Sequence, residues 1–317
     1  MTNEVIERLE ESGSWRTREV TYWAGRWEKL RCQIPQFETV PFQVASDTPA
    51  NPYMKSVIRL PRTKIEQSVP VGIVSNTYTL AQHTEVARKC LQGIQASGIE
   101  TENLRCELGL TELGEWMNLR IYFPDEYSNT PKDNQKLALR LECFNSVDGS
   151  SRLVILLGWF RFVCSNGMVI GETKTEFRDI HNKNMDLERI PKIICQELVK
   201  VQADKERLRR WEETSVGIEK LKPWVNKDVS KKWGKKAACR VYHICEFGHD
   251  VKITDPFAPG DATDKPTKDL EKVPGALEQV TNLYDVSQAL SWVATQRKNT
   301  EERLEWQTAI PDLIQRL

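Results

Sequence analysis

The sequence predicts an α+β protein, in which a central antiparallel β-hairpin meander packs with a long amphipathic helix and a helical part follows at the C-terminus. Three observations predict this fold class. Two apolar runs at 137–144 and 153–164 flank Asp148-Gly149, a pair typical of tight hairpin turns because glycine adopts a positive φ without steric cost. Apolar residues between 186 and 213 recur at three- and four-residue spacing, the period of a helix with one buried face. The stretch 284–317 also shows a helical pattern.

The two apolar runs differ in pattern and therefore in the burial that they predict. In the first run, apolar residues alternate with a second set that includes Arg140 and Glu142, which is typical of a half-buried strand. The second run is apolar almost throughout, so we expect a central strand that is covered on both faces. Ser165-Asn166-Gly167 follows at once, and we interpret it as a second tight turn.

Residues 1–70 are predicted to form an irregular, aromatic N-terminal arm. Six prolines lie between positions 35 and 70, and proline interrupts helices because it lacks the backbone N–H. Several aromatic residues precede them, among them Trp15, Trp23 and Trp27. Such an arm wraps either its own core or a neighbouring subunit, and we favour its own core.

Residues 71–214 are predicted to form the α+β core domain. A strand at 71–74 precedes a helix that begins at Thr79 or Gln82 and runs to about position 96. Gly98 follows this helix, in the place where a left-handed cap is common. Strands at 105–113 and 116–123 flank Gly114 as a hairpin. The long helix is predicted at 186–213, with Pro191 near its first turn, where the missing N–H costs least.

The remaining region, 215–317, divides by charge. Residues 215–240 contain eight basic and two acidic residues, a net charge of +6, whereas 241–317 contain eight basic and thirteen acidic ones. The stretch 255–275 is rich in Pro, Gly and Asp and is predicted to be a mobile loop. Helices are predicted over 284–317, and Pro311 breaks them near the end.

Composition limits the cell compartment and the metal chemistry. Basic and acidic residues balance at 45 each, so any functional charge is local. No apolar run approaches the roughly 20 residues of a membrane helix, and the N-terminus does not read as a signal peptide. We therefore expect a cytoplasmic protein that binds no membrane. The eight cysteines include no Cys-x-x-Cys pair, which favours buried thiols. Cys239, His243, Cys245 and His249 have a spacing that fits neither a zinc finger nor a zinc knuckle.

Catalytic constellations are scarce. The chain has four histidines and lacks a glycine-rich phosphate loop, a serine nucleophile elbow and a His-Glu-x-x-His motif, which are common signatures of enzymes. Asp179 and His181 form the best acid–base pair in the sequence, and we expect a structural role because no nucleophile accompanies them. The sequence therefore predicts no catalytic residue, no cofactor and no metal site.

The centre of the chain resembles a known family. The residues that carry the resemblance belong to the two turns and the adjoining strand ends: Asn145, Ser146, Asp148, Gly149, Ser150, Arg161, Val163, Cys164, Ser165, Asn166 and Gly167. This pattern is similar to the centre of the domain of unknown function 932 family of phage- and plasmid-borne proteins. Weaker similarity elsewhere extends the resemblance over 71–317. The family usually has a His where this chain has Val147, which argues against a catalytic His in this turn. The resemblance implies a mobile-element context and no particular activity.

The basic segment provides the main functional prediction. Lysines beside tryptophans suit single-stranded nucleic acid, because cations neutralise phosphates and an indole can stack on a base. Four of the lysines have the spacing i, i+1, i+4 and i+5, which places them on one face if they belong to a single helix. The predicted nucleic-acid-binding residues are Lys227, Lys231, Lys232, Trp233, Lys235, Lys236 and Arg240.

Two functions are compatible with these features. The first is a nucleic-acid-binding accessory protein of a phage, plasmid or other mobile element, acting in recombination or single-strand annealing, with single-stranded DNA as the favoured partner. The predicted core is similar in outline to the β-β-β-α core of single-strand annealing proteins, an analogy of fold alone. The alternative is a non-catalytic protein-interaction module in phage–host conflict. A homo-oligomer and a protein partner are compatible with either function.

Overall fold

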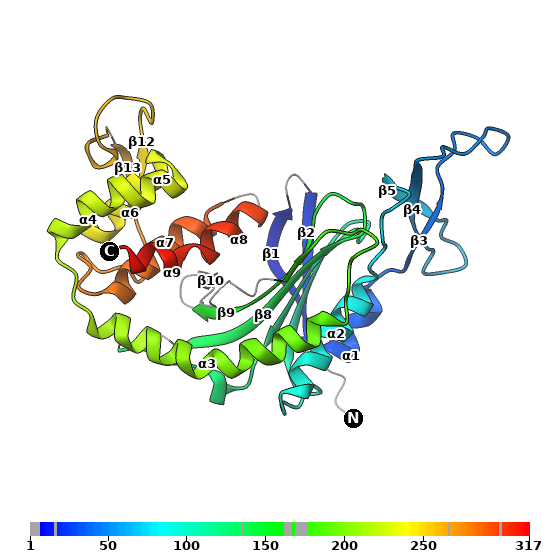
Figure 1. Ribbon diagram of the computed structural model, residues 1–317, viewed down its shortest axis with the longest axis horizontal. Coiled ribbons are helices and arrows are strands. Elements are labelled where there is room, and N and C mark those ends of the chain that lie inside the picture. Colours follow the sequence, from blue (N-terminus) through cyan, green and yellow to red (C-terminus); the bar gives the residue numbers. More distant parts are fainter. Residues whose placement is uncertain are drawn as a thin grey trace. The chain divides into compact units, whose positions relative to one another are not determined.

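The computed structural model describes residues 7–15, 18–132, 134, 136–161, 167–168, 177–265, 267–297 and 300–317. The chain divides into two compact units. Unit 1 comprises Met1–Pro124, Arg140–Leu157 and Lys174–Val199, and unit 2 comprises Asp125–Leu139, Gly158–Thr173 and Lys200–Leu317. The chain is of the α+β class, with antiparallel strands and a helical C-terminal part (Figure 1), which confirms the predicted fold class.

The main sheet has eight strands in the order β1-β2-β6-β7-β8-β9-β10, with β11 also paired to β9. Its strands are β1 (Glu7–Trp15), β2 (Arg18–Arg26), β6 (Arg105–Thr111), β7 (Trp116–Tyr122), β8 (Leu137–Ser146), β9 (Leu153–Arg161), β10 (Gly167–Met168) and β11 (Phe177–Asp179). The predicted hairpins around Gly114 and Asp148-Gly149 are both present, and each glycine has a positive φ. Every residue of β8 is buried, so the prediction that β8 exposes one face is wrong.

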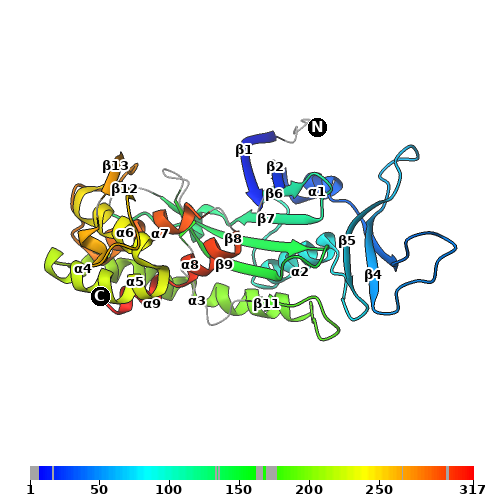
Figure 2. The same ribbon diagram turned by 90° about the horizontal axis from the view of Figure 1, so that it is seen from above.

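A separate antiparallel sheet is formed by β3 (Phe37–Pro41), β4 (Met54–Arg59) and β5 (Val69–Ser75). In Figures 1 and 2 this sheet stands off one end of the main sheet. The prediction of an irregular arm over residues 1–70 is therefore wrong, since β1 to β4 and the start of β5 lie within it. The prolines are tolerated because they lie at strand margins: Pro41 ends β3, and Pro70 lies beside a register shift in the edge strand β5, as expected for proline in sheets.

Three helices precede or follow strands of the main sheet in the chain: α1 (Trp27–Leu30), α2 (His83–Ala96) and α3 (Arg189–Glu213). Short 3₁₀ turns form η1 (Arg31–Gln33) and η2 (Asp125–Tyr127). Both predicted long helices are confirmed. The apolar stripe of α3 is buried, including Ile194 and Leu198. The two helices approach closely at Gly93, where a Cβ atom would lie 2.8 Å from Cβ of Ile194. Glycine is therefore needed at this crossing.

The C-terminal elements of unit 2 are α4 (Ile218–Trp224), the π-helix η5 (Val225–Val229), α5 (Ser230–Trp233), α6 (Lys235–Phe247), β12 (His249–Ile253), η6 (Ala262–Asp264), β13 (Thr267–Lys272), α7 (Leu283–Thr295), α8 (Thr300–Thr308) and α9 (Ile310–Gln315). The predicted mobile loop at 255–275 is only partly a loop, because β13 pairs with β12. Pro311 is confirmed as a break and lies at the start of α9. Within the described ranges, no helix is both long and apolar enough to cross a bilayer.

The turn between β8 and β9 holds several elements of unit 1 together. Asp148 Oδ1 accepts hydrogen bonds from Trp116 Nε1 and from the Ser150 backbone N–H, both at 3.0 Å. Val147 is buried in a cluster with Phe37, Val57, Val74 and Tyr78, which come from the β3–β5 sheet and the turn after it. The turn therefore joins the main sheet to the β3–β5 sheet.

We expect Gly149→Ala to destabilise the protein by more than Gly98→Ala. Both glycines have a positive φ (77° and 84°), so both substitutions carry the cost of a side chain in the left-handed region, of order 1–3 kcal/mol. A Cβ at Gly149 would lie 2.8 Å from Val74 Cγ1, whereas a Cβ at Gly98 meets nothing within 4 Å. Urea unfolding of both variants measures the difference, and equal losses would show that the contact with Val74 relaxes without cost.

Candidate functional site

The basic segment is built from two helical runs rather than one. Elements α4, η5 and α5 follow one another without interruption, and Gly234, at φ 85° and ψ 161°, ends the first run before α6 begins at Lys235. Lys231 and Lys232 therefore lie on α5, and Lys236 lies with Lys235 on α6. The prediction that these four lysines share one face of a single helix is wrong, because Gly234 adopts a backbone conformation that no helix continues.

Five lysines between positions 227 and 236 are exposed and form no ion pair with any residue in the described ranges: Lys227, Lys231, Lys232, Lys235 and Lys236. The acidic residue among them, Asp228, lies 3.6 Å from Arg316, so its charge is offset elsewhere. The first turn of α6 carries no acidic residue and no side-chain cap. The positive potential of a helix N-terminus therefore adds to the lysine charges. We call these five residues the lysine surface.

Trp233 is a core residue. The residue is 7 % exposed, and its ring stacks on that of Trp306, with centroids 4.7 Å apart and an interplanar angle of 4°. The guanidinium of Arg297 lies over the other partner of this stack, 4.5 Å from the Trp306 centroid. The indole proposed to stack on a base thus packs on another indole, and it anchors the end of α5 in unit 2.

Arg240 also belongs to the fold. Its Nε donates to Asp250 Oδ1 at 2.7 Å and its Nη2 donates to Asp250 Oδ2. Trp292 Nε1 donates to the same carboxylate at 3.0 Å. Burial opposes ionisation of Asp250, but the hydrogen bonds and charge of Arg240 outweigh it and hold the pKa of this carboxyl below its ordinary value. The guanidinium therefore joins α6 to β12 and α7, and little of its charge remains for a ligand.

The acid–base pair suggested by the sequence is only partly described. The side chain of Asp179 lies outside the described residues. His181 is buried, stacks on Tyr78 at 5.2 Å, and its carbonyl accepts a hydrogen bond from the Thr79 N–H at 3.2 Å. These contacts tie two distant parts of unit 1 together and support the predicted structural role. Ser165 and Asn166 of the second predicted turn also lie outside the described residues.

His83 is a second buried histidine, and its tautomer follows from its partners. Asn145 Nδ2 is a donor and lies 2.9 Å from His83 Nδ1, so Nδ1 accepts; Nε2 then carries the proton and donates to the Gly114 carbonyl at 2.9 Å. Burial lowers the pKa of His83 to about 4. The ring is therefore neutral near pH 7 and joins α2 to β8 and to the turn between β6 and β7.

The lowered pKa of His83 predicts a loss of stability in acid. The unfolded chain binds a proton near pH 6.5 and the folded chain near pH 4, so stability decreases as the pH falls through this window and levels off below it. The loss attributable to this group is about 3 kcal/mol, at 1.36 kcal/mol for each unit of pKa. Urea unfolding between pH 7 and pH 4, compared with His83→Gln, measures it. A parallel pH dependence in the two proteins would contradict the assignment.

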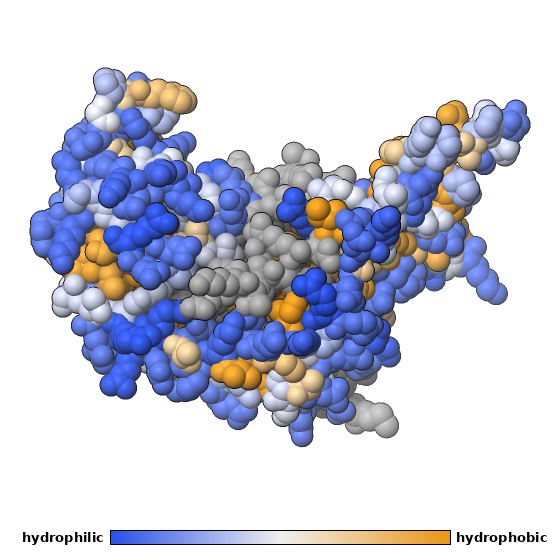
Figure 3. All heavy atoms as spheres, viewed as in Figure 1, coloured by the Kyte–Doolittle hydropathy of each residue, from blue (hydrophilic) through white to orange (hydrophobic). Residues whose placement is uncertain are grey.

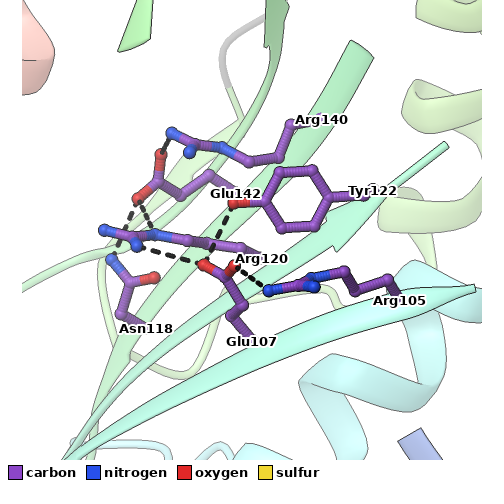
Figure 4. A network of polar contacts seen from close by, with 7 residues as sticks. All are labelled: Arg105, Glu107, Asn118, Arg120, Tyr122, Arg140 and Glu142. Atoms are coloured by element: carbon purple, nitrogen blue, oxygen red, sulfur yellow. Dashed lines mark hydrogen bonds and ion pairs between the residues drawn. The ribbon is translucent and has the colours of Figure 1, made fainter. Parts of the chain in front are cut away.

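Figure 4 shows a network of charged and polar side chains across β6, β7 and β8. Glu107, Arg120 and Glu142 lie directly opposite one another on the three strands. Arg120 donates from Nε to Glu142 at 3.2 Å and from Nη1 to Glu107 at 3.3 Å. Arg140 pairs with Glu142 at 2.6 Å, and the Tyr122 hydroxyl donates to Glu107 at 3.0 Å. Because these charges are buried and mutually neutralised, the network supports the sheet.

We expect Glu142→Gln to cost about 3–5 kcal/mol, because removing one partner of a buried ion pair leaves the other charge uncompensated. Glu112→Gln serves as the control, since Glu112 is exposed in the turn of the β6–β7 hairpin and exposed substitutions usually stay within ±0.5 kcal/mol. Denaturant unfolding of both variants measures the effect. Equal stability of the two variants would mean that the network contributes nothing.

The suggested metal ligands do not gather. Cys239 and Cys245 are buried, and burial raises the pKa of Cys239 to about 11 and that of Cys245 further. Thiols in such surroundings stay protonated. Across the part of the chain that the structure describes, no group of three His, Cys, Asp or Glu residues is arranged to hold a metal ion.

These features define an α+β protein with a charge-stabilised antiparallel sheet in unit 1 and an exposed lysine surface in unit 2. The sequence model of the domain of unknown function DUF932 matches residues 70–300. The chain belongs to this family, which confirms the resemblance seen in the turn sequences. The chain has no significant match among curated proteins or among solved structures.

Proposed function

We propose that this protein is a cytoplasmic nucleic-acid-binding accessory protein of a phage, plasmid or other mobile element, and that the lysine surface contacts the phosphate backbone. The observation that carries the proposal is the set of five exposed lysines within residues 227–236, with the one acidic residue among them offset by Arg316. The chain as a whole has no net charge. Such a local excess of positive charge is the electrostatic footprint of nucleic-acid binding.

The geometry favours backbone contacts over base recognition. Lysine is a flexible point charge that suits phosphates, whereas the residues that could have read or stacked on bases, Trp233 and Arg240, are engaged inside unit 2. Each phosphate contact on a single strand contributes about −0.7 to the logarithmic salt slope. Five contacts would give a slope of about −3.5 and a loss of roughly 100-fold in affinity between 50 and 200 mM salt.

A role in recombination or strand annealing with single-stranded DNA rests on the mobile-element context of the family resemblance. Annealing needs a surface that binds a strand without specificity for sequence. Lysines that contact phosphates and leave the bases free suit this requirement. Assembly of several copies would multiply the surface along one strand, and a homo-oligomer is compatible with the proposal.

A second candidate function, a protein-interaction module in phage–host conflict, is favoured by the apolar surface of the β3–β5 region. Val44, Tyr53, Ile65 and Ile73 are 90 %, 77 %, 94 % and 51 % exposed, and Figure 3 shows apolar residues interspersed on this sheet. Exposed apolar surface is a common feature of protein-binding sites.

We expect replacement of Lys231, Lys232, Lys235 and Lys236 by Glu to abolish low-salt binding to a single-stranded oligonucleotide, because it reverses most of the lysine surface. The matched control changes four exposed lysines elsewhere, Lys183, Lys192, Lys252 and Lys268, to Glu, with the same change in net charge. Fluorescence anisotropy on single-stranded and duplex DNA at several salt concentrations measures affinity and slope. Equal affinity of both quadruple variants would contradict the proposal.

Trp233→Ala tests the same surface in another way. We expect it to lower thermal stability by the cost of a buried aromatic truncation, about 3–5 kcal/mol, and to leave the affinity of the folded fraction unchanged. A weaker affinity without a loss of thermal stability would instead show that the indole contacts the nucleic acid.

A further inference from the structure

A second group of basic residues lies where β4 ends in unit 1. Arg59 is the last residue of β4, and Arg62 and Lys64 follow in the connection to β5. Arg62 and Lys64 are exposed, Arg59 is half-buried, and Ile65 in the same connection is 94 % exposed. Arg62 and Lys64 are therefore accessible from solvent, and Arg59 is accessible in part.

Arg59 forms no ion pair within the part of the chain that the structure describes. It lies opposite Phe37 on β3 and Val69 on β5, which carries its stem to the end of the apolar cluster around Val57. Its Nε is buried and makes no hydrogen bond, and its guanidinium makes no ion pair with any residue in the described ranges. A buried N–H without a partner costs free energy, so this arrangement is incomplete.

Arg62 adds a second guanidinium of the same sign. Its Nη2 donates to the Gln33 carbonyl at 2.6 Å, which fixes one side of the fork. Partial burial, and then the neighbouring charge of Arg59, lower the pKa of Arg62. Glu66 is the one acidic residue between positions 59 and 68, and its Oε2 accepts from the Arg62 backbone N–H at 2.8 Å. This stretch thus contains one carboxylate and three cations, which are Arg59, Arg62 and Lys64.

The geometry points to a binding site for a phosphate group formed by Arg59 and Arg62, with Lys64 beside it. Arg59 and Arg62 carry like charges three residues apart in the chain, and an oxyanion bound by both would neutralise this excess of positive charge. Arginine suits this ligand because its planar fork donates two parallel hydrogen bonds to phosphate oxygens. Arg62 Nη2 is already oriented by the Gln33 carbonyl, and no hydrogen bond to a described residue occupies Arg59 Nε.

Two sources can supply a phosphate, a free phosphate compound and the backbone of a nucleic acid. Binding to either places an oxyanion between the same two arginines. If the source is a nucleic acid, this site in unit 1 contacts its backbone in addition to the lysine surface of unit 2. This case rests on the proposed function. The phosphate site itself does not depend on that function.

The test compares thermal unfolding in sodium phosphate and in sodium chloride at equal pH and ionic strength. The wild type, Arg59→Gln and the control Arg88→Gln are used, since Arg88 is an exposed arginine on α2 of the same unit. At phosphate concentrations ten times the dissociation constant we expect the Tm of the wild type and of Arg88→Gln to rise by about 3–6 °C, and that of Arg59→Gln to rise by less. In chloride, Arg59→Gln should be at least as stable as the wild type, because it removes an unpaired charge.

An equal rise in all three proteins would overturn the proposal, because phosphate stabilises proteins in general by exclusion from their surface. Arg62→Gln is the second variant if Arg59→Gln fails to fold, and the same loss of the phosphate effect is expected. The source is identified with a single-stranded oligonucleotide: a salt slope reduced by about 0.7 in Arg59→Gln assigns the site to the nucleic-acid backbone, and unchanged binding assigns it to a free phosphate compound. The quadruple lysine variant should keep the rise of Tm in phosphate. A failure of the proposed function can therefore be distinguished from a failure of the phosphate site.

Discussion

Arg120 lies between the carboxylates of two neighbouring strands, and this placement constrains the register of the main sheet. A slip of β7 by one residue would turn Arg120 to the face opposite Glu107 and Glu142 and separate it from both carboxylates. Because the charges are buried, a wrong register leaves them without compensation, at a cost of several kcal/mol for each ion. The network therefore stabilises one pairing mainly by making the alternatives unfavourable. The β8–β9 turn, α2 and the β3–β5 sheet are positioned from this register.

Wherever the structure describes them, the residues that identify the family mainly stabilise the fold. Asn145 holds His83 and the carbonyl of Ala81, Ser146 bonds the backbone of Ser151, and Asp148 holds Trp116. Each of these groups satisfies a buried polar partner, which is a stringent requirement in a close-packed interior. Membership in the DUF932 family therefore specifies an architecture. The residues proposed to contact a ligand lie elsewhere, and the five of the lysine surface are exposed and form no ion pair within the described ranges.

Local pattern predicted the elements whose cause is local. The period of α2 and α3 and the glycines at 98, 114 and 149 gave the two helices and two hairpins correctly. Strand β3 could not be found in this way, because Pro41 lies at a margin that only the pairing with β4 defines. Alternating Arg140 and Glu142 looked like a solvent face, since a single strand does not show which charges lie opposite. Gly234 was visible in the sequence, and its position between two pairs of lysines was the available signal that they lie on two helices.

Both compact units are assembled from separated stretches of chain, and β8, β9 and α3 each contribute residues to both. A gene exchange that cuts the coding sequence once cannot transfer either unit intact. Residues 200–317, which hold the lysine surface, lack the stretches at 125–139 and 158–173 that complete their unit. The two units are therefore inherited together, and variation among relatives is expected to accumulate as substitutions on their surfaces rather than as exchange of one unit for another.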